Sequence, residues 1–145
     1  MEKNLKIKLN KKYSLYGKFS GDFNSPLFIV IYGFLGDMDE GLYSSATDWF
    51  NKKNFSTFRF NLYGYQKDAR QSMDCTLEIH ANDIDTVVDY FRKKGVKRIF
   101  IAGHSFASLV MLSSRKQNFD GAVLWDPAYK FSFIKPTQGF PSPKY

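Results

Sequence analysis

The stretch that decides the fold is Gly-His-Ser-Phe-Ala at residues 103–107. It follows the apolar run at residues 98–102 and precedes a helix-like stretch from Phe106 to about Arg115, which predicts strand, sharp turn and helix in direct succession. A nucleophile elbow has this arrangement, because the turn presents a serine hydroxyl at the end of a parallel strand and small flanking residues let strand and helix approach. Ser105 is therefore a candidate nucleophile. The alternative is an ordinary serine that caps the helix.

A second loop with a functional pattern is Tyr-Gly-Phe-Leu-Gly-Asp at residues 32–37. It follows the continuously apolar run at residues 27–31, which is typical of a strand buried on both faces of a parallel sheet. The alternative is a plain turn between strand and helix that contains two glycines. The two loops occur after strands in the same chain, which favours a functional role for both.

The other predicted elements complete an alternation of strands and helices. They are an antiparallel hairpin of strands at 5–9 and 15–19, a short helix from near Tyr43 to Asn51, a strand at 55–62, a helix at 76–94 ended by Gly95, and a last strand at 121–125. This order predicts an α/β fold, a mostly parallel sheet with an antiparallel amino-terminal hairpin and helices on both faces, joined by right-handed crossovers.

Polar residues occur within these elements in regular patterns. The strand at 55–62 alternates through Arg59 and Asn61. In the helix at 76–94 the apolar residues recur at helical spacing, with Asp83, Asp85 and Asp89 elsewhere around the helix. His80 lies on the apolar stripe of that helix, where a satisfied, partly buried histidine is expected.

Length and composition favour a single domain. The 145 residues suffice for one core, and we expect a domain at 1–135 followed by a loose, proline-rich tail at 136–145. The single Cys75 fits a reducing compartment and is expected to be an ordinary loop residue. The amino terminus alternates charged and apolar residues, unlike a signal peptide, and no apolar stretch is long enough for a membrane span. A cytoplasmic protein without a membrane partner is expected.

Charge and metal-ligand spacing argue against two other classes of function. The net charge of +7 invites a nucleic-acid interpretation, but the amino-terminal lysines alternate with Leu5, Ile7 and Leu9, as on the solvent face of a strand. No nucleic-acid motif accompanies them, so nucleic acid is disfavoured as a partner. No His, Cys, Asp or Glu pair has metal-ligand spacing and no phosphate loop is present, so we expect neither metal nor cofactor.

With these loops and elements, the chain resembles the amino-terminal half of an α/β-hydrolase. The resemblance covers nearly all of it, from the hairpin to Asp126, and rests on residues 32–37 as the oxyanion loop, on Asn-Leu-Tyr-Gly-Tyr at 61–65, and on 103–107 as the elbow. The fold expected from it is therefore a truncated α/β-hydrolase fold.

The chain departs from the family pattern in three respects. Tyr32 stands where a histidine usually precedes the loop glycine, and Ala107 replaces the last glycine of the elbow. Members of this family are also longer, and their triad histidine follows the last strand, downstream of the acid. The last 38 residues of this chain contain no histidine, and His104 is expected only to pack.

The resemblance implies a serine hydrolase that acts on carboxylic esters or thioesters through an acyl-enzyme on Ser105. The backbone N–H groups of Phe34 and Phe106 would form the oxyanion hole, and Leu35 and Trp125 would contact an apolar acyl group. Asp126, after the last strand, is either the triad acid or the start of an ordinary turn.

The same resemblance leaves a second class of function open. With the triad histidine missing from the chain, the alternative is a non-catalytic α/β-hydrolase-like module for binding or assembly. The expected partners are a small-molecule acyl ester or thioester and, through the exposed apolar edge strand at 121–125, a second copy of the chain.

Overall fold

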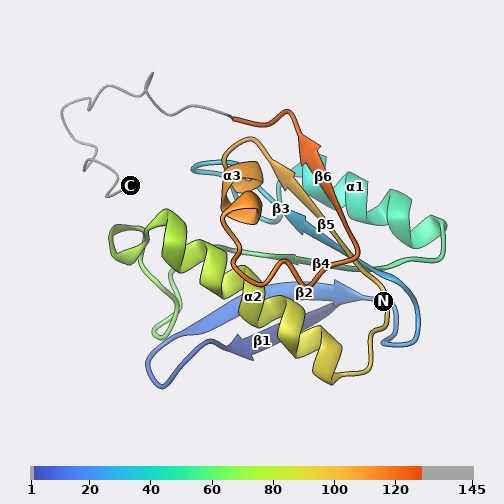
Figure 1. The fold of residues 1–145 in the computed structure, drawn as a ribbon, viewed down its shortest axis with the longest axis horizontal. Coiled ribbons are helices and arrows are strands. Elements are labelled where there is room, and N and C mark those ends of the chain that lie inside the picture. Colours follow the sequence, from blue (N-terminus) through green and yellow to red (C-terminus); the bar gives the residue numbers. More distant parts are fainter. Residues whose placement is uncertain (1, 129–145) are drawn as a thin grey trace.

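Residues 2–128 are described by a computed structural model as one six-stranded sheet with helices on both faces (Figure 1). The strands are β1 (Lys3–Lys8), β2 (Ser14–Ser20), β3 (Leu27–Ile31), β4 (Ser56–Phe60), β5 (Ile99–His104) and β6 (Gly121–Trp125). The helices are α1 (Gly41–Lys52), α2 (Leu77–Lys93) and α3 (Phe106–Leu112), with a single 3₁₀ turn, η1 (Ser72–Asp74), before α2.

The sheet has the predicted mixed topology. Its strand order is β1-β2-β4-β3-β5-β6, in which β2 pairs antiparallel with both β1 and β4 and all other pairs are parallel. The predicted fold class is therefore confirmed. The expected domain end at residue 135 and the tail at 136–145 lie outside the described residues.

The helices cover the two faces unequally. α1 packs against β3 and β4 on one face, while α2 and α3 lie together on the other face and α3 packs on β5 and β6 (Figure 1). All five residues of β3 are buried, as its continuous apolar run predicts. Gly95, at φ 94°, follows α2 as expected. No helix within residues 2–128 is long and apolar enough to cross a membrane.

Arg59 of β4 is buried, although polar and apolar residues alternate in the sequence at this point. All five residues of β4 are buried. The Arg59 guanidinium lies under α1, donates to Thr47 Oγ1 at 3.1 Å and pairs with Glu2 and with Asp39 at 3.3 Å. β4 is an inner strand that is buried along its whole length, so a charged side chain there must find partners inside the protein.

Two aspartates of α2 are likewise buried and bonded. The Asp83 carboxylate accepts from Arg70 Nε and an Arg70 terminal nitrogen at 2.7 and 2.9 Å, and Asp85 accepts from Ser114 Oγ at 2.5 Å. Burial raises the pKa of Asp83, and the Arg70 charge opposes that rise. α3 ends at Leu112, before the predicted Arg115.

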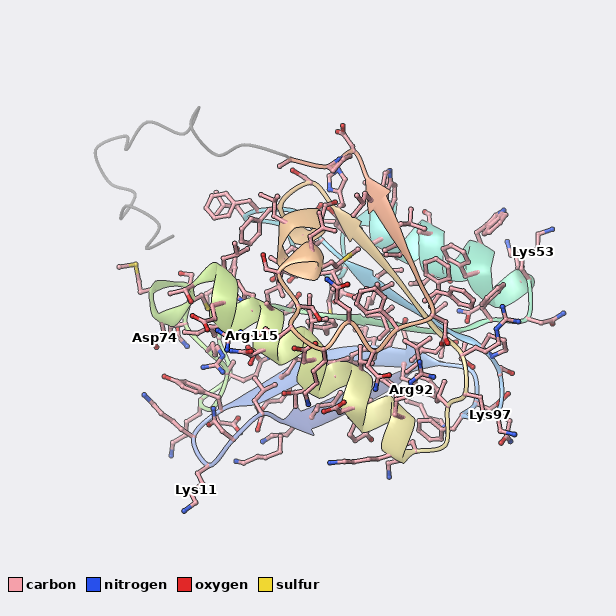
Figure 2. All side chains as sticks on the ribbon, in the orientation of Figure 1. Lys11, Lys53, Asp74, Arg92, Lys97 and Arg115 are labelled. Carbon is pink, nitrogen blue, oxygen red and sulfur yellow. The ribbon has the colours of Figure 1, made fainter. Side chains whose placement is uncertain are left out.

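Charged side chains point away from the sheet at separate places. Lys11, at the β1–β2 turn, and Lys53, after α1, extend outward from opposite ends of the molecule (Figure 2).

Candidate active site

Ser105 forms the whole turn between β5 and α3. Its backbone has φ 51° and ψ −114°, a region that residues with a Cβ rarely occupy. Its N–H donates to the Trp125 carbonyl at 3.0 Å, and its carbonyl accepts from the Ala128 N–H at 3.2 Å. Its side chain makes no capping hydrogen bond to α3, so the alternative that Ser105 is an ordinary helix cap is not supported.

A glycine is required where the strand meets the helix. A Cβ on Gly103 would lie 2.4 Å from Met111 Sδ and 2.7 Å from the Ala107 carbonyl carbon. The absence of a side chain therefore lets α3 return closely along β5, which keeps the Ser105 turn sharp.

The loop after β3 lies against this turn. A Cβ on Gly33 would approach His104 Nδ1 to 3.0 Å and the Ser105 Cβ to 3.3 Å. The Gly33 carbonyl accepts from the Gly36 N–H at 3.1 Å, closing a turn in which Leu35 has φ 60°. Within residues 2–128 the Phe34 N–H donates to no acceptor. The two predicted functional loops are thus adjacent.

The apolar residues predicted to contact an acyl group lie in two separate places. The rings of Phe34 and Phe106 meet edge to face with centroids 5.7 Å apart, and Phe34 and Leu35 are 38% and 59% exposed beside the turn. Trp125 instead packs its ring on His104, with centroids 5.5 Å apart.

Trp125 also lines an apolar groove of about 360 Å³ on the α1 side of the sheet. The other lining residues are Phe28, Val30, Ala46, Trp49, Phe50, Ala102 and Val123. No ring contact joins Trp125 to the Phe34–Phe106 pair in the described chain.

Asp126 follows β6 directly and is exposed, with φ 45°. The bond between the Ser105 N–H and the Trp125 carbonyl brings this end of β6 beside the turn. The Asp126 carboxylate accepts no hydrogen bond from residues 2–128. The Ala128 N–H, two residues further on, donates to the Ser105 carbonyl and not to the Asp126 carboxylate.

Neither histidine is hydrogen-bonded to Ser105 among residues 2–128. His104 Nδ1 lies 2.9 Å from the Tyr43 hydroxyl, so His104 does more than pack. His80 is 3% exposed and packs edge to face on Phe106, and its Nδ1 has no partner in the described chain. The expectation of a satisfied histidine at position 80 is therefore wrong. Burial, and to a smaller extent the Arg70 charge, lowers the pKa of His80 to about 4.

Cys75 is not an activated nucleophile. Burial raises the pKa of its half-buried thiol to about 12, and the thiol donates to the Gln71 carbonyl at 3.3 Å. A thiolate is the reactive form of cysteine, so this environment suppresses reactivity.

Sequence reasoning missed two tyrosine hydroxyls that hold the site loops. Tyr43, on α1, accepts from the Gly33 N–H at 3.2 Å and contacts His104. Tyr32 accepts from the Leu62 N–H at 2.9 Å and is buried. The tyrosine at position 32, which departs from the family pattern, thus joins the loop after β3 to the loop after β4. Nothing in the local sequence around either tyrosine signals its distant partner.

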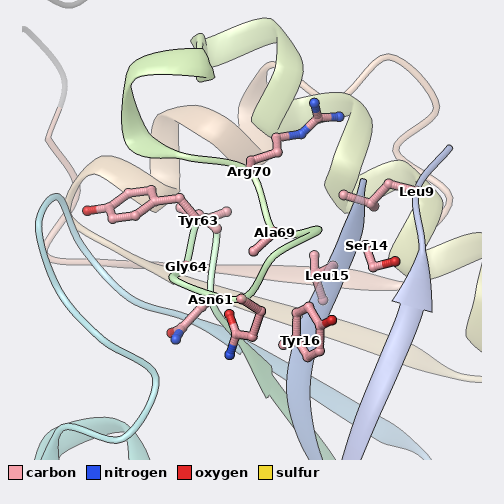
Figure 3. Close-up of a pocket in the computed structure, with 11 residues that line it drawn as sticks. Leu9, Ser14, Leu15, Tyr16, Asn61, Tyr63, Gly64, Ala69 and Arg70 are labelled. Carbon is pink, nitrogen blue, oxygen red and sulfur yellow. The ribbon is translucent and has the colours of Figure 1, made fainter. Parts of the chain in front are cut away.

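A separate small cavity lies between the β1–β2 hairpin and the loop after β4 (Figure 3). Its volume of about 10 Å³ suits a single water, and the buried Ser14 Oγ at its wall has no partner among residues 2–128. Ser105 does not line it, so this cavity is no substrate site.

Comparisons with solved structures give many matches at high probability. Est1E of Butyrivibrio proteoclasticus, solved with bound ferulic acid, matches with 27% identity and a TM-score of 0.74 over 86% of this chain and 53% of that chain. An esterase of Pyrococcus furiosus matches with 18% identity and a TM-score of 0.73 over 88% and 51%. An α/β serine hydrolase without a lid from Xanthomonas campestris matches with 14% identity and a TM-score of 0.69 over 93% and 66%.

This chain spans about half the length of the first two of these proteins. The sequence matches no protein-family model, and the search of curated proteins found no match.

Proposed function

We propose that this chain, which has the α/β-hydrolase fold and belongs to that superfamily, carries the nucleophile and oxyanion loop of a serine hydrolase for carboxylic esters or thioesters. One observation carries the proposal. Ser105 is held at φ 51° between β5 and α3 by backbone hydrogen bonds on both sides, while its hydroxyl caps nothing. Strain of this kind persists where the surrounding structure enforces it, and it concentrates at functional sites.

The chemistry follows from this placement. Ser105 Oγ attacks the carbonyl carbon of the ester or thioester while its proton passes to a base. The N–H groups of Phe34 and Phe106 stabilise the oxyanion, and loss of one such donor removes about 2.7–4 kcal/mol of transition-state stabilisation. The alcohol or thiol leaves with the proton of the base. Water then attacks the acyl-enzyme, releases the carboxylic acid and restores the hydroxyl.

The base is a histidine supplied by sequence outside this chain. Of the two histidines present, His104 is bonded to Tyr43 and His80 is buried behind Phe106. Asp126 is the candidate acid that would orient this histidine, since it follows β6 at the end that bonds to Ser105. The proposal also places the protein in the cytoplasm.

Exposed apolar side chains support an apolar acyl group. Phe34 and Leu35 leave much of their surface open next to Ser105. Est1E is solved with ferulic acid, and the similar Pyrococcus furiosus protein is an esterase. A ferulic acid complex and an esterase among the similar structures support esters ahead of thioesters.

Labelling with a fluorophosphonate tests the proposal, with free imidazole as a substitute for the missing base. Removal of a triad member lowers the rate by about 10⁴–10⁶-fold, so labelling is slow without imidazole and rises with its concentration. Ser105→Ala abolishes the labelling. Ser113→Ala, which removes a hydroxyl bonded to the Leu109 carbonyl at the end of α3, leaves it unchanged.

Two outcomes would contradict parts of this account. Absence of labelling on a folded chain at every imidazole concentration would reject the nucleophile role. Fast labelling without imidazole would show that a base lies within the chain and reject an external histidine.

The second candidate function is a non-catalytic module for binding or assembly. The apolar groove on the α1 side and the open edge at β6 favour it, since both offer surface to a partner. Imidazole-dependent labelling of Ser105 would argue against this alternative.

A further inference from the structure

Tyr43 is a single side chain that touches both loops of the proposed active site. Its hydroxyl oxygen accepts from the Gly33 N–H at 3.2 Å and lies 2.9 Å from His104 Nδ1. The residue is 3% exposed. A hydroxyl donates one hydrogen bond and can accept two. Among residues 2–128, His104 Nδ1 is the one acceptor within hydrogen-bond distance of the Tyr43 hydroxyl, so the hydroxyl proton is assigned to the bond with His104 Nδ1. The histidine is then the acceptor, with its own ring proton on Nε2.

This chain of hydrogen bonds fixes the residue before the oxyanion donor. The Gly33 N–H is held by Tyr43, and the Gly33 carbonyl is held by the Gly36 N–H at 3.1 Å. In a planar trans peptide the carbonyl and the following N–H point in opposite directions. Fixing the Gly33 carbonyl therefore also fixes the direction of the Phe34 N–H, which meets no acceptor in residues 2–128.

The hydrogen bond between the Tyr43 hydroxyl and His104 fixes the strand that leads to the nucleophile. His104 is the last residue of β5 and immediately precedes Ser105. Its ring is held by the Tyr43 hydroxyl on one side and by the Trp125 ring, at 5.5 Å between centroids, on another. The Tyr43 hydroxyl thus sets the position of the oxyanion loop relative to the Ser105 turn.

We infer that Tyr43 is a positioning residue that aligns the Phe34 N–H with Ser105, with His104 as its hydrogen-bond acceptor. The inference rests on the proposed function. Tyr43→Phe leaves both the Gly33 N–H and His104 Nδ1 without a hydrogen-bond partner among residues 2–128. A buried polar group without a hydrogen bond is unfavourable, so the loop at residues 32–37 then moves away from the Ser105 turn.

A matched substitution separates positioning from general stability. Ser56→Ala also removes a buried hydroxyl that accepts a backbone N–H, from Asp22 at 2.9 Å, but this hydroxyl lies at the start of β4 and does not contact Gly33 or His104. Both variants are expected to lower the melting temperature by similar amounts. Only Tyr43→Phe is expected to disturb the alignment of the oxyanion loop.

The experiment measures the imidazole-assisted rate of fluorophosphonate labelling of Ser105 in the full chain and both variants. Outright loss of an oxyanion donor slows a reaction by about 10²–10³-fold, and misalignment should give about 10- to 100-fold for Tyr43→Phe. Ser56→Ala should label at nearly the unmodified rate. An unchanged rate in Tyr43→Phe, or equal losses in both variants, would overturn the inference.

A second readout does not depend on activity. In ¹⁵N spectra of the unmodified chain, His104 Nδ1 should have the shift of a hydrogen-bond acceptor, and Tyr43→Phe should change this signal and the Phe34 amide signal together. Ser56→Ala should change neither. If the unmodified chain does not label at all, the proposed function fails. An unmoved Phe34 amide in Tyr43→Phe would still reject the positioning role by itself.

Discussion

At the scale of single residues, Ser105 and His80 each have an unfavourable feature that packing of the core does not explain. Ser105 keeps a positive φ that glycine would adopt without strain, and backbone bonds to Trp125 and Ala128 maintain it. His80 keeps a buried nitrogen without a partner in the described chain, against the ring of Phe106. Both residues thus lie next to the proposed oxyanion hole.

His80 should make the stability of the protein depend on pH. Burial lowers its pKa from 6.5 to about 4 in the folded chain, so between these values the unfolded chain binds more protons. The free energy of unfolding is therefore unaffected by protonation of His80 above pH 6.5, and it decreases as the pH falls from 6.5 toward 4. The full difference is about 3 kcal/mol in the free energy of unfolding.

Urea unfolding of the unmodified chain and of His80→Leu, at several pH values between 7 and 4, measures this contribution. The difference in unfolding free energy between the two proteins should narrow, or reverse in favour of the variant, as the pH falls. A difference that stays constant over this range would contradict the assignment to His80.

At the scale of elements, local sequence patterns predicted strand bounds and burial. Contacts between residues distant in the sequence could not be predicted. β6 has the predicted bounds Gly121–Trp125, and β3 is buried along its whole length, because continuous apolar runs report on burial directly. The burial of Arg59 could not be predicted, since its partners Glu2 and Asp39 are set by the fold.

The same division applies to the candidate site. The adjacency of the loop at 32–37 and the turn at Ser105 follows from parallel strands ending at one edge, and the sequence predicted both loops. Tyr43 was missed because its hydroxyl bonds residues 10 and 61 positions away. Side-chain bonds over such distances exist only once α1 has packed on the sheet.

The buried pair between Arg70 and Asp83 should stabilise the junction between the loop after β4 and α2. Asp83 is 5% exposed, so Arg70→Met leaves a buried carboxylate without its partner and lowers the unfolding free energy by about 3–5 kcal/mol. Arg115→Met breaks an exposed pair with Glu78 and should change it by less than about 1 kcal/mol. Chemical denaturation measures both, and equal effects would contradict the importance of burial.

At the scale of the whole molecule, the sheet formed by residues 2–128 ends at an apolar strand. β6 is the last strand of the described sheet, and its Val123 and Leu124 are 48% and 42% exposed. On the α1 side the groove beside Val123 and Trp125 leaves further apolar surface open. Parallel sheets are normally covered on both faces, and unpaired apolar edges associate with other chains.

The chain should therefore self-associate through β6. Light scattering near ~100 μM should show species larger than a monomer, because association follows mass action. Val123→Lys places a charge at the edge and should shift the population to monomer. Leu42→Lys, at an equally exposed apolar position on α1, should not. A clean monomer for the unmodified chain, or equal effects of the two variants, would contradict association through this edge.

The central claim is that Ser105 is the nucleophile, and mass spectrometry after fluorophosphonate treatment with imidazole tests it most directly. The account predicts one adduct per chain, located by peptide mapping on Ser105, with none on the buried Ser108 of α3 or on Cys75. A folded chain with no adduct on Ser105, or with adducts spread over several exposed residues at similar levels, would contradict it.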